Sequence, residues 1–187
     1  MANNTIYAAI YTRCSGSSGA LTIYGMIVDG NTLAASDIYI HADVEASVVS
    51  NNVVANKLNL GSSSVDGCIF SGNRIGDDFD MSSVTSIASS RFVGNVIGDA
   101  TAGQFRFPPE ADFGASGDTQ SVFIGNHAYQ WVGDGGDPMD LSGGSVSKPF
   151  VWANTAIVAS SNFTHASSTS RTIENTNSIQ YGTGISL

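Results

Sequence analysis

The chain has 187 residues, a formal net charge of −9 and an isoelectric point near 4.4. The length suits a single domain, expected to span residues 1–187, and the acidic balance argues against nucleic acid and anionic membrane surfaces as partners. The sequence has neither a run of 18 apolar residues nor a basic N-terminal segment followed by an apolar one, so it predicts no membrane span and no signal peptide.

From the N-terminus onward, the chain repeats one short pattern around an asparagine. Asn4, in NNTIYAAI, begins an early copy because Ile6 follows two places later. The clearest copies are VVSNNVV (48–54), IFSGNRI (69–75), RFVGNVI (91–97) and VFIGNHA (122–128). The recurring asparagines are Asn31, Asn52, Asn73, Asn95, Asn126, Asn154 and Asn177. Their intervals of 21 to 31 residues predict a repeat architecture.

The positions around each asparagine form consistent columns. Branched or aromatic residues occupy most positions three and four places before it, and an aliphatic residue or alanine lies two places after it. Such residues favour strands, whereas the glycine or asparagine often found directly before it tolerates the left-handed backbone of a sharp bend. Each copy therefore predicts a strand, a bend and a second strand. Between neighbouring copies, the asparagines should stack about 4.8 Å apart and form hydrogen bonds along the column.

The repeat length fits two architectures. A leucine-rich repeat needs a leucine framework and often a helix in each repeat, but leucine is scarce here and no long segment has helical periodicity. Short strands rich in serine, glycine and asparagine favour an all-β fold, a single-stranded parallel β-helix of about seven to eight rungs with 21–23 residues each. We expect Cys14 and Cys68 to be free thiols, at least one of them buried.

Two intervals exceed the repeat, and the extra residues lie at 98–118 and 132–145. Because both follow the same bend on consecutive rungs, both loops should leave one side of the solenoid, where binding faces often lie. The first loop carries the glycan-binding candidates, aromatic rings beside carboxylates: Phe105, Phe107, Glu110 and Asp112. The alternative is that the phenylalanines pack against the solenoid or a neighbouring subunit.

The second loop contains three aspartates spaced by three residues. Asp134, Asp137 and Asp140 are weak candidates for calcium, which prefers oxygen ligands in glycine-containing loops. The match to an EF-hand loop is poor, so a solvated acidic turn is the better interpretation. The sequence predicts no metal site and no cofactor.

Asp77 and Asp99 both lie four places after a column asparagine, and we expect them to be stacked neighbours. Two carboxylates about 5 Å apart resist sharing negative charge, so one pKa should rise. A glycoside hydrolase uses such a pair as acid and base or nucleophile. The alternative is an exposed turn in which water screens the repulsion. We favour a protein without catalytic activity and keep the enzyme as the alternative.

The segments SNNVV (50–54), SGNRI (71–75), VGNVI (93–97) and IGNHA (124–128) resemble the pectate-lyase-like right-handed parallel β-helices, above all those of bacteriophage tailspikes and virion surface proteins. This resemblance implies a homotrimer at the particle surface that contacts other virion proteins and bacterial polysaccharide. The expected function is structural: capsid decoration, cement or a tailspike-type protein that stabilises the particle, adheres to host glycans, or does both. The alternative is a polysaccharide depolymerase, a glycoside hydrolase or lyase. Tailspikes usually have a head domain and more rungs than this chain. The chain is therefore expected to be either a fragment or a small intact subunit, and we favour the intact subunit.

Overall fold

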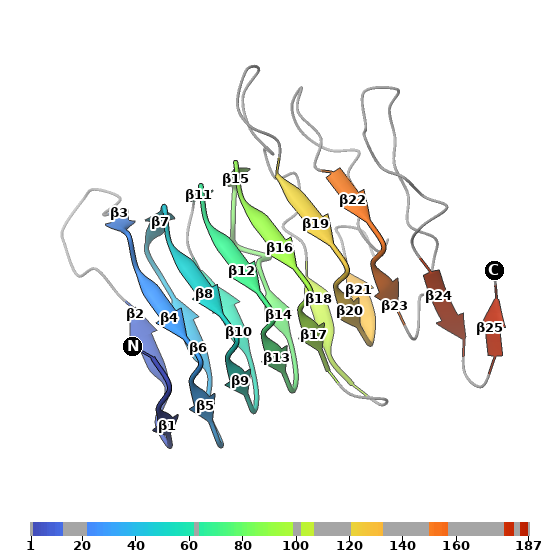
Figure 1. Ribbon diagram of the computed structural model, residues 1–187, viewed down its shortest axis with the longest axis horizontal. Helices are drawn as coiled ribbons and strands as arrows, with labels where there is room; N and C mark the ends of the chain where they lie inside the picture. Colours follow the sequence, from blue (N-terminus) through green and yellow to red (C-terminus); the bar gives the residue numbers. More distant parts are fainter. Residues whose placement is uncertain are drawn as a thin grey trace.

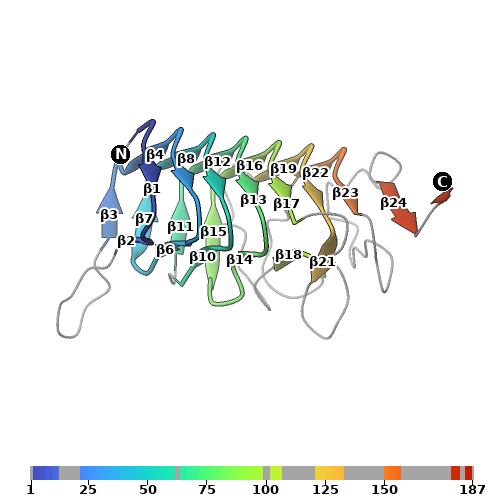
Figure 2. The same cartoon turned by 90° about the horizontal axis from the view of Figure 1, so that it is seen from below.

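The protein is an all-β parallel solenoid, seen in a computed structural model that describes residues 2–12, 22–61, 64–98, 102–106, 121–132, 150–156, 178–181 and 184–186 (Figure 1). This part of the chain contains no helix, and therefore none long and apolar enough to span a membrane. The strands are short and stack turn upon turn along one axis (Figure 2).

The strands form four sheets, A to D, which the chain visits in that order in each complete turn. Sheet A contains β4 (Ile27–Asp29), β8 (Val48–Ser50), β12 (Ile69–Ser71), β16 (Arg91–Val93), β19 (Val122–Ile124) and β22 (Phe150–Trp152). Sheet B contains β1 (Thr5–Ile6), β5 (Thr32–Leu33), β9 (Val53–Val54), β13 (Arg74–Ile75), β17 (Val96–Ile97), β20 (His127–Ala128), β23 (Thr155–Ala156), β24 (Ser178–Tyr181) and β25 (Gly184–Ser186).

The other two sheets close the turn. Sheet C contains β2 (Ile10–Thr12), β6 (Ile38–Ile40), β10 (Leu58–Leu60), β14 (Phe79–Asp80), β18 (Gln104–Arg106) and β21 (Gln130–Val132). Sheet D contains β3 (Thr22–Tyr24), β7 (Asp43–Glu45), β11 (Ser64–Asp66) and β15 (Ser86–Ala88). Neighbouring strands pair in parallel throughout, except that β25 is antiparallel to β24.

Three consecutive turns carry strands on all four sides: β4 to β7, β8 to β11 and β12 to β15. The parallel solenoid is thus confirmed, but about three complete turns are shown where the sequence predicts seven to eight rungs. The other described strands supply only some sides of a turn. After β18, residues 107–120, 133–149 and 157–177 lie outside the described residues.

The bend between sheets A and B has the same backbone geometry in each turn. The residue directly before the column asparagine has a positive φ, from 55° to 65°, at Gly30, Asn51, Gly72, Gly94, Gly125 and Ala153. Glycine and asparagine adopt this left-handed conformation at low cost, whereas Ala153 adopts it with steric strain. The left-handed backbone of the bend therefore explains why glycine usually precedes the column asparagine.

The asparagines after these bends form a continuous buried ladder. Its members are Asn31, Asn52, Asn73, Asn95, Asn126 and Asn154. The backbone N–H and the Nδ2 of each donate to Oδ1 of the next over 2.9–3.1 Å. From Asn52 onward, Nδ2 also donates to a backbone carbonyl at 2.8–2.9 Å, so the buried amides are well paired. This is the stacking that the sequence predicts, although Asn177 lies outside the described residues.

The interior is filled by inward-facing side chains that also stack from turn to turn. Phe70, Phe92 and Phe123 of sheet A have ring centroids 5.0 and 4.5 Å apart and nearly parallel planes. Opposite them, Phe79 and Phe105 of sheet C stack at 4.8 Å. All five rings are at most 1 % exposed, so they form an aromatic core along the middle turns.

The position of Phe105 in this core corrects the prediction that Phe105 binds a glycan. Its side chain is 0 % exposed because Phe105, on β18 of sheet C, pairs in register with Phe79 and faces the core. Strand β18 also shows that part of the span 98–118 belongs to the wall of the solenoid. Just before this strand, Gly103 lies against Gly98: a Cβ on Gly103 would collide with the backbone of Gly98 and would lie 2.8 Å from the carbonyl oxygen of Asp77.

A second polar column, which the sequence analysis missed, lies at the bend between sheets D and A. The N–H of Met26 donates to Ser47 Oγ at 3.0 Å, and the N–H of Cys68 donates to Ser90 Oγ at 3.1 Å. Ser90 in turn donates its N–H to Ser121 Oγ at 3.2 Å. Cys68 occupies the place of a serine, is free and buried as expected, and burial raises its pKa.

Candidate functional site

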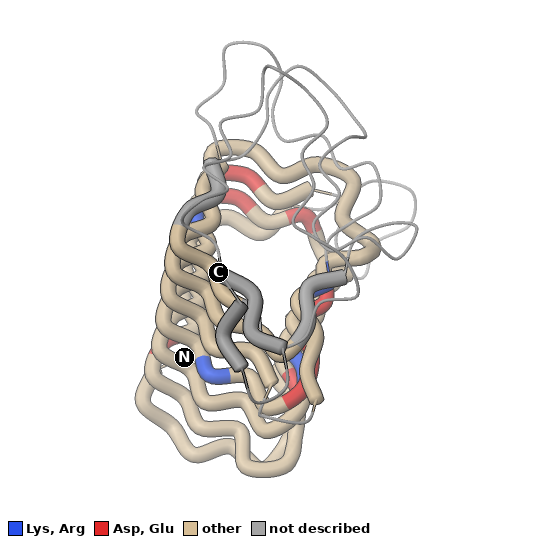
Figure 3. Tube along the Cα trace, turned by 90° about the vertical axis from the view of Figure 1, so that its right-hand side faces the viewer, with Lys and Arg blue, Asp and Glu red and all other residues tan. Residues whose placement is uncertain are grey.

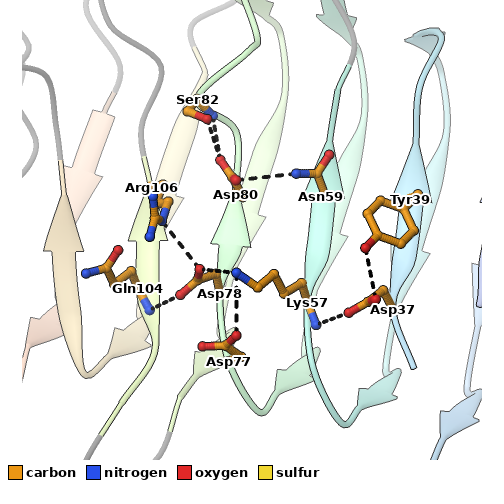
Figure 4. A network of polar contacts seen from close by, with 10 residues as sticks. All are labelled: Asp37, Tyr39, Lys57, Asn59, Asp77, Asp78, Asp80, Ser82, Gln104 and Arg106. Carbon is orange, nitrogen blue, oxygen red and sulfur yellow. Dashed lines mark hydrogen bonds and ion pairs between the residues drawn. The ribbon is translucent and has the colours of Figure 1, made fainter. Parts of the chain in front are cut away.

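A shallow hollow of about 420 Å³ lies at the outer surface of sheet C, and we refer to it as the sheet C hollow. Polar side chains line it, and the polar network around them appears in Figure 4. The lining residues are Lys57, Asp77, Asp78, Ala102, Gly103, Gln104, Arg106 and Tyr129.

Asp78 is the centre of this network. It is only 4 % exposed, yet its Oδ2 lies 2.8 Å from Lys57 Nζ and 3.4 Å from Arg106 Nε. Its Oδ1 accepts the backbone N–H of Gln104 at 3.0 Å. A buried carboxylate is stable only when such partners replace the water that it has lost, so Asp78 fixes both cations in position.

Strand register explains why these groups meet. Leu58 pairs with Phe79, so the residues directly before them, Lys57 and Asp78, are neighbours on adjacent turns. The same position one turn earlier is Asp37, whose Oδ1 accepts the N–H of Lys57 at 2.8 Å. Charges therefore alternate along the column. The hydrogen bond to Asp78 raises the pKa of Lys57, and partial burial opposes this rise.

A second outer column of sheet C runs beside the first. Asn59 Nδ2 donates to Asp80 Oδ2 at 3.3 Å, and Ser82 Oγ donates to Asp80 Oδ1 at 2.7 Å. Arg106 follows Asp80 in register. Its Nε is buried and has no hydrogen bond within the described chain, although its side chain is 41 % exposed. The guanidinium is thus accessible in part and not fully paired.

Asp77, one of the two predicted catalytic residues, lies at the rim of the hollow. Its carboxylate is 44 % exposed and lies 3.5 Å from Lys57 Nζ. Asp99 is outside the described residues, so the pair stays a prediction. The offset that suggested it does not hold, because Phe79 pairs with Phe105 and the register counterpart of Asp77 is therefore Gly103.

The other predicted site residues also lie outside the described part of the chain. These are the glycan-binding candidates Phe107, Glu110 and Asp112 and the calcium candidates Asp134, Asp137 and Asp140. Among the residues that the structure describes, no group of histidine, cysteine and acidic side chains could hold a metal ion. The predicted loop insertions at 98–118 and 132–145 stay predictions, because most of their residues lie outside the described part of the chain.

The charges around the hollow favour an uncharged polar ligand. Four carboxylates, Asp37, Asp77, Asp78 and Asp80, accompany two cations, Lys57 and Arg106. Acidic residues also outnumber basic ones along the described trace (Figure 3). An anion would meet a negative field here, whereas a polyhydroxylated ligand could use both the donors and the acceptors.

The outer face of sheet A carries one largely apolar column beside a second column that holds Asp29, Ser50 and Ser71 in its first three turns. Ile27 is 59 % and Ile69 38 % exposed, and Val48 and Val122, in the same column, are half-buried. Arg91 interrupts this column. An exposed row of branched side chains is typical of a surface that another protein covers.

Comparisons with family models, with curated proteins and with solved structures found no match. Function therefore has to be inferred from the chemistry of these outer faces and from the sequence motifs.

Proposed function

We propose that the protein is a structural protein on the surface of a bacteriophage particle, a right-handed β-helix that assembles as a homotrimer through the outer face of sheet A. The apolar column on this face carries the proposal, and the G-N-x-I motifs support it because they resemble those of phage surface proteins. A rigid solenoid with paired amides along its length suits a capsid decoration, cement or tailspike-type role. The virion surface is accordingly the proposed location.

A second copy fits this face for a geometric reason. Strands of sheet A stack in register, so their outward side chains form straight columns from turn to turn. A neighbouring copy with its axis parallel would lay the same columns alongside, burying branched side chains that water now contacts. Other virion proteins could cover whatever part of the face the copies leave exposed.

We predict that Ile69→Lys weakens self-association at least about tenfold, because an unpaired ammonium would be buried in the interface. Analytical ultracentrifugation should give the wild type a mass near three times 19.3 kDa. The matched control is Val53→Lys. Val53 is 45 % exposed on the outer face of sheet B, so this variant adds the same charge away from the interface and should keep the wild-type mass. A wild type that is monomeric at micromolar concentration would contradict this assembly.

Adhesion to a host-surface glycan is the second proposed role, and the sheet C hollow favours it. The hollow presents a half-exposed carboxylate, Asp77, two cations held by Asp78, and the side chain of Tyr129. Hydroxyl groups of a sugar can both donate to and accept from such a set. The excess of carboxylates favours neutral over acidic glycans.

We predict that Arg106→Ala weakens binding to neutral glycans at least about tenfold, since it removes charged donors from the hollow. A glycan array probed with fluorescent protein measures this. Arg74→Ala removes an exposed arginine from the outer face of sheet B and should bind like the wild type. Equal losses in both variants, or a wild type that prefers acidic glycans, would count against this role.

A further inference from the structure

The sheet C hollow contains one carboxylate that the fold leaves accessible to a ligand, that of Asp77. Asp78 beside it is only 4 % exposed, and its two oxygens already bind two cations and one backbone N–H. The carboxylate of Asp77 is 44 % exposed, and its one ion pair within the described chain is the 3.5 Å contact with Lys57. Asp78 therefore holds the network together, whereas Asp77 has acceptor positions to offer to a ligand.

The neighbouring turns leave this carboxylate uncovered. Because Phe79 pairs with Phe105, the register counterpart of Asp77 in the next turn is Gly103, which has no side chain. A Cβ on Gly103 would lie 2.8 Å from the carbonyl oxygen of Asp77, so the close approach of the two turns depends on glycine. In the preceding turn the counterpart is Asn56, which is exposed. The position beside Asp77 in the next turn thus adds no side chain to the hollow.

Lys57 brings a hydrogen-bond donor to the same place. Its Nζ lies 2.8 Å from Asp78 Oδ2 and 3.5 Å from Asp77 Oδ2, between the two carboxylates (Figure 4). An ammonium group has three N–H donors, and these two contacts account for two of them. Because the side chain of Lys57 is 41 % exposed, the third N–H can donate to a ligand that Asp77 also contacts.

An acceptor and a donor in one place select for hydroxyl groups. A hydroxyl donates and accepts through a single oxygen, whereas an amide divides these roles between two atoms and a carboxylate only accepts. The two oxygens of Asp77 can accept from two hydroxyls that lie on adjacent carbons, and Lys57 can donate to the oxygen of one of them. Hydrogen bonds to charged groups are stronger than those between neutral groups, so this pair should dominate the selectivity.

We propose that the sheet C hollow recognises a vicinal diol of a neutral sugar. Asp77 accepts from both hydroxyls, Lys57 donates to one of their oxygens, and Arg106 and Tyr129, which line the rest of the hollow, contact the remainder of the sugar. This inference rests on the proposed adhesion to host-surface glycans and specifies which part of the sugar is bound. A sugar that lacks either hydroxyl leaves one acceptor of Asp77 without a partner.

Deoxygenated sugars test this recognition directly. The probes are the methyl glycosides of glucose, galactose and mannose, together with every analogue that lacks one hydroxyl, and ligand-observed NMR titrations measure their affinities for the full chain. We expect at least one parent glycoside to bind. Loss of either of two hydroxyls on adjacent carbons should weaken binding at least about tenfold, roughly the loss of one hydrogen bond to a charged group. Loss of any other hydroxyl should change the affinity less than about threefold.

A variant of Asp77 shows whether this residue binds the diol. Asp77→Asn keeps the size of the side chain but replaces one acceptor oxygen by an amide donor, so it should weaken binding of the parent glycoside at least about tenfold. The two critical deoxy analogues should then bind within about threefold of the parent, because the partner of the diol has been removed. Asp66→Asn, on β11 of sheet D and not in the lining of the hollow, is the matched control and should leave every affinity unchanged.

The outcomes separate the diol from the adhesion role. If glycosides bind and Arg106→Ala weakens their binding, but no adjacent pair of hydroxyls matters or Asp77→Asn binds like Asp66→Asn, the diol inference is overturned and adhesion stands. A diol preference that persists in Asp77→Asn also overturns it, because another group then binds the hydroxyls. If none of the glycosides and no glycan on the array binds the wild type, the adhesion role and the diol are overturned together.

Discussion

Replacing Asn73 by alanine is expected to lower the free energy of unfolding by about 3–5 kcal/mol, since it leaves several buried polar groups without partners. Oδ1 of Asn73 accepts from the N–H and Nδ2 of Asn52 at 3.1 and 3.0 Å. Its Nδ2 donates to the carbonyl of Val49 and to Oδ1 of Asn95, both at 2.9 Å. The side chain is 1 % exposed, so water cannot replace these bonds without opening the bend.

Urea unfolding followed by far-ultraviolet circular dichroism measures this loss. Asn56→Ala, in an exposed turn two places after Val54, is the matched control and should change the free energy of unfolding by less than about 0.5 kcal/mol. If Asn73→Ala costs no more than this control, the ladder does not stabilise the fold in the way that its geometry indicates.

The second large effect is expected at Phe92, which lies in the middle of the aromatic core. Its ring stacks between Phe70 at 5.0 Å and Phe123 at 4.5 Å and also contacts Phe79 at 5.9 Å. Phe92→Ala should lower the free energy of unfolding by about 3–5 kcal/mol, because it removes a fully buried ring and leaves a cavity between turns.

The size of the cavity can be tested with a graded series under the same urea conditions. Phe92→Leu keeps most of the volume and should cost less than Phe92→Ala, about 1–2 kcal/mol. Val96→Ala, at a 37 % exposed position on the outer face of sheet B, should cost less than about 1 kcal/mol. Equal losses for Phe92→Ala and Val96→Ala would show that the aromatic stack does not contribute to stability.

The ladder could be predicted from the sequence because every turn needs the same backbone there. The left-handed residue before Asn52 or Asn73 restricts which residues fit. The Oδ1 of each buried amide accepts from the asparagine of the neighbouring turn, so the same residue type recurs in every turn. Inward positions two places later, such as Val54 and Ile75, follow because the strand of sheet B starts directly after the asparagine.

The site on sheet C could not be predicted in the same way, because the chain between sheets B and C varies in length. Sheet C begins at Ile38, Leu58, Phe79 and Gln104 after asparagines 31, 52, 73 and 95, so no constant offset connects the two positions. Counting from Asn95 therefore placed Asp99 opposite Asp77 and gave no sign that Asp78 is the buried centre of the network. Without a fixed offset, Phe105 was also assigned to a loop rather than to the core.

The column of Ser47, Cys68, Ser90 and Ser121 was missed for a different reason. Serine is common throughout this chain, and cysteine replaces it in one turn, so the residue type alone gives a weak signal. The residues one place before Ser47, Cys68 and Ser90 have a positive φ, but they are Ala46, Gly67 and Ser89. Since only one of the three is glycine, the residue types do not reveal this bend.

The contact between Gly98 and Gly103 has a consequence for how such a protein can change over evolutionary time. Both residues have positive φ, 79° and 116°, and neither could carry a Cβ without displacing backbone atoms of the other glycine. We expect both positions to accept only glycine over evolutionary time, because a side chain at either one would push apart the two backbone segments that position β17 and β18.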